Sequence, residues 1–64
     1  MCESNAYFLR GKKEELFLKD VTLIRPVSPG EWLVENLLGE QKKFRGRISQ
    51  IDFMAHKILL LPEE

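Results

Sequence analysis

The sequence of 64 residues predicts an all-β fold, a small antiparallel barrel or curled sheet of five to seven short strands. Apolar residues recur with a period of two much more often than 3.6, as in strands that bury one face. Glycines and prolines separate these apolar runs at intervals of about ten residues, which is typical of small all-β domains. The chain contains no repeat and no segment with the length and periodicity of a useful helix.

The first half of the chain contains three apolar runs that predict strands. They are residues 6–9, 15–19 and 21–25. A turn around Gly11, which can take a positive φ, separates the first two runs. Asp20 separates the second run from the third run, which is rich in β-branched residues. Two prolines and a glycine within residues 26–30 predict a loop.

The second half of the chain continues the same pattern. Residues 32–38 are short and lie between two glycines, which favours a strand over a helical turn and a half. Gly39 and Glu40 form the next turn, and residues 41–53 then return across the sheet. The apolar residues of this return segment are out of strict register, so a β-bulge near Ser49 and Gln50 is expected.

The last expected strand, residues 58–61, is apolar on both faces. An edge strand of a monomer normally keeps one face polar. Either this strand is central in the barrel of one chain, or another subunit covers its second face, together with Trp32 or Leu38. Chain length supports a homodimer, because a chain of this size buries only about 60% of its surface when it folds alone.

Composition limits the classes of function. Ten basic and ten acidic residues give zero net charge, so no overall basic field attracts nucleic acid. There is no apolar run that could span a membrane and no secretory leader. The unpaired thiol and the missing leader together favour the cytoplasm. We expect one domain, residues 1–64, that is not an enzyme, because so short a chain has almost no room for a closed catalytic pocket.

The single cysteine, Cys2, is the candidate metal ligand. One thiol excludes an intrachain disulfide and a zinc finger built by one chain. Removal of Met1 would give Cys2 a free α-amine, and thiolate, amine and the next amide nitrogen would form adjacent chelate rings suited to Ni(II) or Cu(II). A two-fold dimer would bring both Cys2 thiolates into one S₂N₂ plane. The alternative is an inert thiol near a chain terminus.

A basic segment is the second candidate site, for RNA. Its cations surround Phe44 in the sequence and are Lys42, Lys43, Arg45 and Arg47. Such cations can contact phosphates while an aromatic ring stacks on a base. The alternative is a solvated strand face with Phe44 in the core, which zero net charge and the alternation of side chains both favour.

No catalytic residues are predicted. His56 lies in an expected turn with no second histidine or cysteine nearby, so it is interpreted as a surface residue. The adjacent glutamates at 14–15 and 63–64 do not resemble a catalytic pair and are interpreted as solubilising charge. Trp32 is interpreted as a core or interface residue.

The sequence resembles the CooT family over essentially its whole length. The segments that carry the resemblance are residues 1–7, 11–16, 18–21, 39–42 and 56–60. The opening Met-Cys is the only chemically diagnostic part. The resemblance implies a small all-β homodimer that binds Ni(II), needs Cys2, and delivers nickel to the active-site cluster of carbon monoxide dehydrogenase. Some members of the family have also been labelled as RNA-binding proteins.

Overall fold

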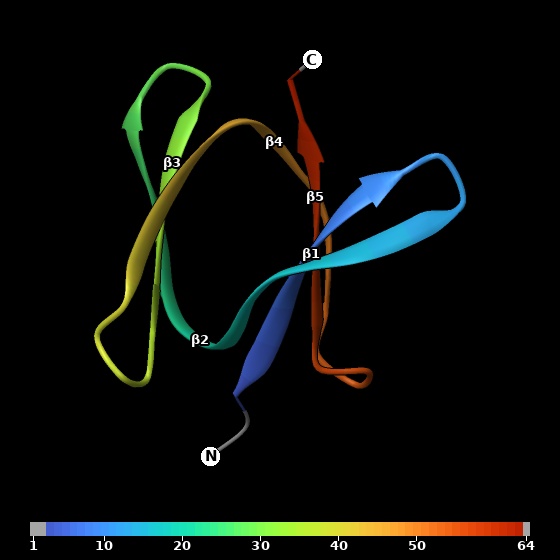
Figure 1. The fold of residues 1–64 in the computed structure, drawn as a ribbon, viewed down its shortest axis with the longest axis horizontal. Coiled ribbons are helices and arrows are strands. Elements are labelled where there is room, and N and C mark those ends of the chain that lie inside the picture. Colours follow the sequence, from blue (N-terminus) through green and yellow to red (C-terminus); the bar gives the residue numbers. More distant parts are fainter. Residues whose placement is uncertain (1–2, 64) are drawn as a thin grey trace.

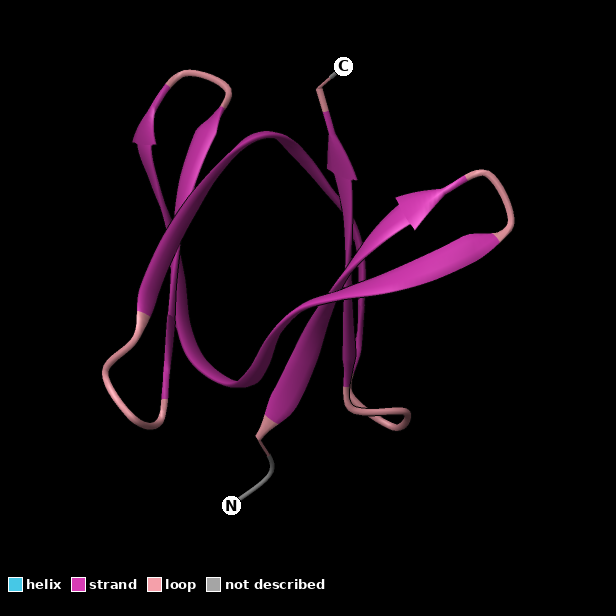
Figure 2. Ribbon diagram, viewed as in Figure 1, coloured by secondary structure: helices cyan, strands magenta, loops and turns pink. Residues whose placement is uncertain are grey.

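The computed structural model describes residues 3–63, which form five strands (Figures 1 and 2). The strands are β1 (Ser4–Arg10), β2 (Lys13–Ser28), β3 (Glu31–Asn36), β4 (Gln41–Asp52) and β5 (Lys57–Pro62). The predicted all-β class is confirmed, with the strand number at the lower end of the expected range. In the part of the chain that the structure describes, no helix is long and apolar enough to cross a membrane.

The five strands close into a barrel in the order in which they occur in the sequence. Strands that follow one another along the chain pair antiparallel. The ring is closed by β1 and β5, which pair in parallel from Asn5 opposite Lys57 to Phe8 opposite Leu60. The sheet is therefore antiparallel, as predicted, except where the first and last strands meet.

Strand β2 departs most from the predicted elements. Two strands divided at Asp20 and a loop at residues 26–30 were expected, but one strand of 16 residues runs through both positions. Asp20 has a φ of 56° and lies where β2 passes from β1 to β3, so it alters the course of the strand without ending it. Pro26 lies in the half of β2 that pairs with β3 alone. Proline has no backbone N–H to donate, and it is tolerated here because this half of β2, like an edge strand, has a single neighbour.

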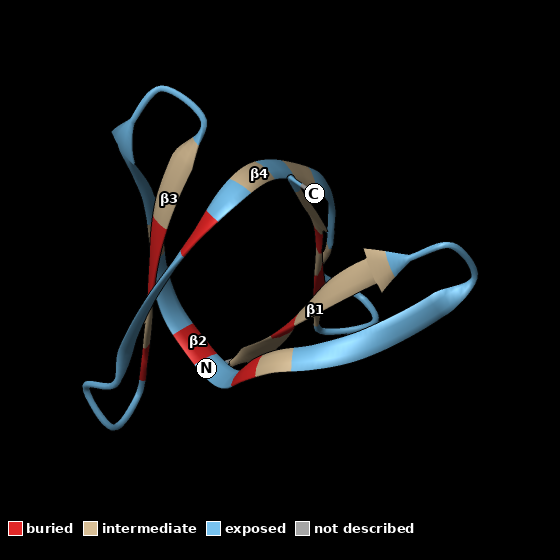
Figure 3. Ribbon diagram, turned by 45° about the horizontal axis from the view of Figure 1, so that its top comes forward, coloured by how far each residue is buried: buried red, intermediate tan, exposed pale blue. Residues whose placement is uncertain are grey.

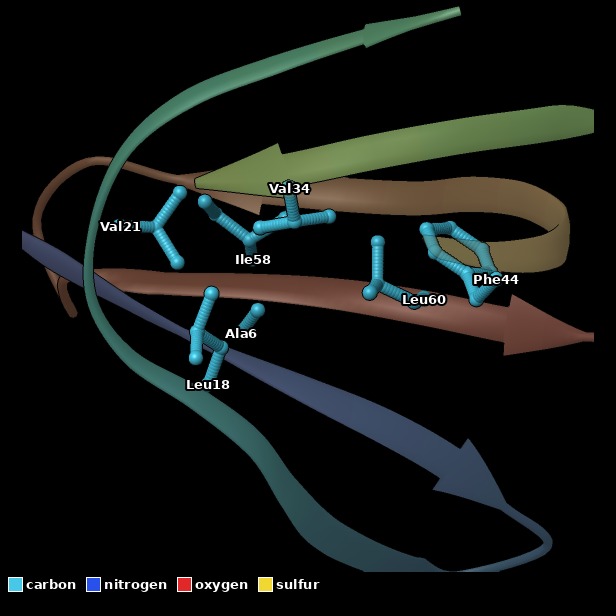
Figure 4. Packing of buried hydrophobic residues seen from close by; sticks show 7 residues of the cluster. All are labelled: Ala6, Leu18, Val21, Val34, Phe44, Ile58 and Leu60. Carbon is cyan, nitrogen blue, oxygen red and sulfur yellow. The ribbon is translucent and has the colours of Figure 1, made fainter. Parts of the chain in front are cut away.

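Buried apolar side chains from all five strands fill the barrel (Figure 4). They are Ala6, Leu18, Val21, Val34, Phe44, Ile58 and Leu60. Phe44 lies inside, with its ring centroid 5.8 Å from those of Phe8 and Phe17. The aromatic residue of the basic segment is therefore a core residue.

Strand β5 is central, because it pairs with β1 on one side and with β4 on the other. Ile58 and Leu60 are buried, whereas Leu59 and Leu61 are half-buried. This is the first of the two alternatives considered for the last strand. The bulge predicted near Ser49 is confirmed by a register shift between Ile48 and Gln50.

Strand β3 is shorter than expected, and its residue Trp32 packs within its own chain. Strand β3 ends at Asn36, so Leu38 lies in the turn before β4 rather than in a strand. Trp32 packs against the core, and its Nε1 donates a hydrogen bond to the carbonyl of Gly46 at 3.1 Å. Of the two residues suggested for an interface, Trp32 is thus partly buried in its own chain and Leu38 is exposed.

Candidate functional site

The candidate metal ligand Cys2 lies outside the described residues, and the described element that follows it in the sequence is β1. This strand begins at Ser4, two positions after Cys2 in the sequence. Two residues span at most about 7 Å of extended chain. The candidate site is therefore confined to the end of the barrel at which β1 begins.

Asn5 connects the start of β1 to two other parts of the barrel. Its backbone N–H donates to the carbonyl of His56, in the turn between β4 and β5, at 3.0 Å. Its side-chain Oδ1 accepts a hydrogen bond from the N–H of Asp20 at 2.9 Å. The carbonyl of Asp20 in turn accepts from the N–H of Leu37, in the turn between β3 and β4, at 2.9 Å. These bonds hold both turns beside the start of β1.

The same bonds explain two unusual backbone conformations. Asp20 and His56 have φ values of 56° and 58°, and they are the non-glycine residues with positive φ in the described part of the chain. Aspartate, asparagine and histidine adopt this conformation more readily than other side chains. Both residues present a backbone group to Asn5, so the strained positions serve to fix the place where β1 enters the barrel.

Lys57 lies opposite Asn5 in the pairing of β1 with β5. Its Nζ donates to Oε1 of Glu14 at 2.8 Å and lies 5.7 Å from the ring centroid of Tyr7. The hydrogen bond to Glu14, followed by the charge of that carboxylate, raises the pKa of Lys57 above its usual value. Lys57 is therefore positively charged throughout the physiological pH range.

Within residues 3–63, no group of three or more His, Cys, Asp or Glu side chains could hold a metal ion. His56, the single histidine of the chain, is exposed in its turn, as predicted. Among the described residues of one chain, no cluster of three such side chains is therefore available for a metal ion.

The basic segment does not form an aromatic and cationic surface. Phe44 is in the core, and Lys42 Nζ lies 5.4 Å from the ring centroid of Phe17 and donates to the Phe17 carbonyl at 3.2 Å. Arg45 forms an ion pair with Glu63 at 3.5 Å. Lys43 and Arg47 are exposed on the outside of β4. RNA binding stays a prediction, but Phe44, the residue that was to stack on a base, is buried in the core.

A recess of about 430 Å³ lies at the other end of the barrel, where β5 ends. Its lining consists of Gly30, Gly46, Arg47, Leu61, Pro62 and Glu63. The lining side chains include one cation and one carboxylate but no thiol, hydroxyl or imidazole. This recess therefore lacks the groups that a nucleophilic or metal-assisted reaction needs.

Known proteins resemble the chain over nearly all of its length. Residues 1–61, a span that includes Cys2, match the family described as CO dehydrogenase accessory protein CooT. A protein of Methanothermobacter thermautotrophicus, described as uncharacterized, is 34% identical over 64 residues, which are 100% of this chain and 94% of the relative. The crystal structure of a "putative CooT from Carboxydothermus hydrogenoformans" matches with a TM-score of 0.89 and 38% identity, over 98% of this chain and 100% of that one.

Proposed function

The chain belongs to the CooT family of CO dehydrogenase accessory proteins, and from this premise we propose that it is a nickel metallochaperone for carbon monoxide dehydrogenase. In this proposal one Ni(II) ion is held at a homodimer interface by Cys2 of both chains. The observation that carries it is the family match over residues 1–61 together with a cysteine at the second position. An accessory role needs a ligand and a partner surface but no catalytic groups, which suits a chain of this size.

The chemistry of the ligands supports nickel. Thiolate sulfur and backbone nitrogen are donors that a square-planar divalent ion prefers, whereas Mg²⁺ and Ca²⁺ prefer oxygen. One Cys2 supplies too few donors to complete such a plane, and residues 3–63 provide no further cluster. A two-fold axis doubles the donors without any additional residue type. The dimer and the metal site are thus parts of one hypothesis.

The structure around Asn5 also suits a metal ligand. Hydrogen bonds to His56 and from Asp20 fix the start of β1, a few positions after Cys2 in the sequence, on two sides. A site supported in this way loses less conformational entropy when the metal binds. We expect binding to release protons, because a thiol and an amine must deprotonate, and affinity to fall as the pH drops below their usual pKa values of about 8.

The test is a nickel titration of untagged, metal-free protein beside the Cys2→Ser variant. We expect the wild type to bind one Ni(II) per two chains and to develop a sulfur-to-metal charge-transfer band. The Cys2→Ser variant should lose both signals. The His56→Asn variant, which removes the one imidazole but keeps a side chain that tolerates the positive φ at this position, should keep them. Intact mass of the same samples shows whether Met1 has been removed and the α-amine is available. An identical band and stoichiometry in Cys2→Ser would overturn the proposal.

A further inference from the structure

The first half of β2 has a neighbouring strand on one side only. Residues 13–18 pair with β1, and pairing with β3 begins at Val21. In an antiparallel pair, alternate residues direct their N–H and C=O groups away from the partner strand. Residues 13–19 therefore present backbone donors and acceptors along a free side of the strand, which we call the open edge. Its first residues, 13–16, are exposed (Figure 3).

A lysine side chain from β4, rather than a strand, contacts the open edge. Lys42 Nζ donates to the carbonyl of Phe17 at 3.2 Å and lies 5.4 Å from the centroid of the Phe17 ring. Residues 41–45 of β4 also have a single neighbour, β3, because pairing with β5 begins at Gly46. In the described part of the chain, one side chain thus spans the space between two half-strands that each lack a second neighbour.

Charge is distributed unevenly around the open edge, although the net charge of the chain is zero. Residues 10–19 and 41–45 contain seven of the ten basic residues but two of the ten acidic ones. Both of these carboxylates already form ion pairs. Among the described residues, Lys13 and Lys19 form no ion pair, and they are exposed at the two ends of the open edge. The edge is therefore electrostatically complementary to carboxylates.

We propose that the open edge is the docking site for an extended acidic segment of a partner protein, which adds to β2 as a further strand. Backbone hydrogen bonds hold the segment in register, and its carboxylates contact Lys13 and Lys19 at the ends of the edge and Lys42 between them. Residues 13–19 span about 20 Å, the length of about six or seven residues of extended chain. The inference goes beyond the proposed function, since neither nickel nor Cys2 takes part in the docking.

The lysines also make the open edge selective. Lysine on an exposed edge discourages pairing with other chains, because its charge has to be covered by the added strand. A neutral or basic segment leaves that charge unbalanced, whereas an acidic segment neutralises it. The same residues therefore reject most strands and accept one class.

The aromatic rings beside the open edge favour a protein segment over RNA. Phe8 and Phe17 are half-buried, and Arg10 and Lys42 lie over their rings at 5.5 and 5.4 Å. Phe44, which packs against both rings, is buried. None of these rings is free to stack on a base, which is how single-stranded RNA is normally held. The edge offers backbone groups instead, and these are what an added strand uses.

The test is an NMR titration of metal-free protein with a blocked synthetic peptide of about eight residues that alternates glutamate and valine. We expect the amide resonances of residues 13–19 to shift, alternate amides among them to exchange more slowly, and the affinity to fall as salt rises. The same peptide with every backbone nitrogen methylated keeps its charge but cannot donate to a strand. Its affinity should be at least about tenfold lower. A peptide with lysine in place of glutamate should not bind.

Paired charge reversals locate the site. K13E/K19E should raise the dissociation constant of the acidic peptide at least about tenfold, because two attractive contacts become repulsive. R25E/R47E, which reverses two exposed cations outside the open edge, is the matched control and should change the constant less than about threefold. Far-UV circular dichroism establishes that the variants are folded, and the methylated peptide tests strand pairing on the wild type alone.

Three results overturn the proposal. They are resonance shifts that fall outside residues 13–19, a methylated peptide that binds as tightly as its parent, and equal effects of the two paired reversals. Octauridylate that binds the open edge more tightly than the acidic peptide also overturns it, in favour of a nucleic-acid surface. Cys2→Ser should bind the peptide like wild type, so none of these results bears on the nickel titration.

Discussion

At the scale of single residues, Lys57 shows how the fold changes an ionisable group. The hydrogen bond to Glu14 and the charge of that carboxylate raise the pKa of Lys57 above its usual value. Because the folded pKa is the higher one, the contribution of this pair to stability is fully present below the unfolded pKa of about 10.5. It is lost only as the pH rises through the folded pKa. Any pH dependence of nickel binding near neutrality therefore comes from other groups.

The hydrogen bond between Lys57 and Glu14 predicts how the NMR resonances of the Lys57 side chain titrate with pH. In Glu14→Gln, we expect the midpoint of the Lys57 Nζ and Cε resonances to move to lower pH, because the carboxylate that stabilises the ammonium group is gone. Glu15→Gln is the control, since Glu15 pairs with Arg10 at 2.7 Å rather than with Lys57. NMR titration of the three proteins between pH 8 and 12 measures the shift. A Lys57 midpoint that stays in place in Glu14→Gln contradicts the assignment.

Residues could be predicted from the sequence where their role is local. The exposed turn position of His56 and the inward position of Phe44 follow from spacing and alternation alone. Glu14 was interpreted as solubilising charge, because its partner Lys57 lies far along the chain. The hydrogen bonds of Asn5 were not predictable for the same reason. No local pattern distinguishes an asparagine that joins Asp20 and His56 from one on a solvated strand.

At the scale of elements, Gly46 determines how β4 and β5 approach each other. Its φ is 147°, and a Cβ at this position would overlap the carbonyl oxygen of Leu61 and lie 2.9 Å from Cα of Pro62. The Gly46 N–H donates to the carbonyl of Gly30 at 2.9 Å, and its own carbonyl accepts from Trp32. A side chain here would push apart two strands that pair along most of their length.

We expect Gly46→Ala to lower the free energy of unfolding by about 2–4 kcal/mol, because two backbones must separate to admit the methyl group. Gly39→Ala is the matched control. Gly39 has a φ of 84° in open space, so its substitution adds backbone strain of only about 1–2 kcal/mol. Urea unfolding followed by circular dichroism measures both. Equal losses in the two variants would show that the close approach to Leu61 is unimportant.

The elements also show where local signals are sufficient. The turns at Gly11 and Gly39 and the β-bulge near Ser49 were all predicted. Each depends on local backbone conformation alone, which the local sequence indicates. The length of β2 was not, because Asp20 and Pro26 are poor strand residues by local propensity. Pairing with β1 before Asp20 and with β3 after it outweighs that propensity. A long strand shared by two neighbours cannot be recognised from either half alone.

At the scale of the whole molecule, the barrel has two unlike ends. One is the end where β1 begins, and the other carries mainly polar turns (Figure 1). Six exposed apolar side chains lie at the first end, which we call the apolar end: Leu23, Leu37, Leu38, Ile51, Phe53 and Met54. The buried apolar core consists of a few side chains, so folding of one chain alone is marginal. If the homodimer of the proposed function covers the apolar end, it adds buried apolar surface without lengthening the chain. Stability, dimerisation and metal binding should then be linked.

This linkage predicts that the melting temperature depends on protein concentration. If dissociation and unfolding are coupled, a dimer of two 64-residue chains should melt about 5 °C higher for each tenfold increase in concentration, as the unfolding enthalpy of such a chain implies. Free Ni(II) at about 100 times its dissociation constant should add about 2.7 kcal/mol of stability. Differential scanning calorimetry over a hundredfold range of concentration measures both effects.

Two variants separate the contributions to this melting behaviour. In Cys2→Ser, the nickel shift should disappear while the concentration dependence remains, because the apolar end is unchanged. In L38S/M54S, the melting temperature should be lower and independent of concentration, because the chain unfolds as a monomer. A wild-type melting temperature that is constant over the whole range would mean that the barrel is stable without a partner. The roughly 60% of its surface that a chain of this size buries on folding alone would then suffice for stability.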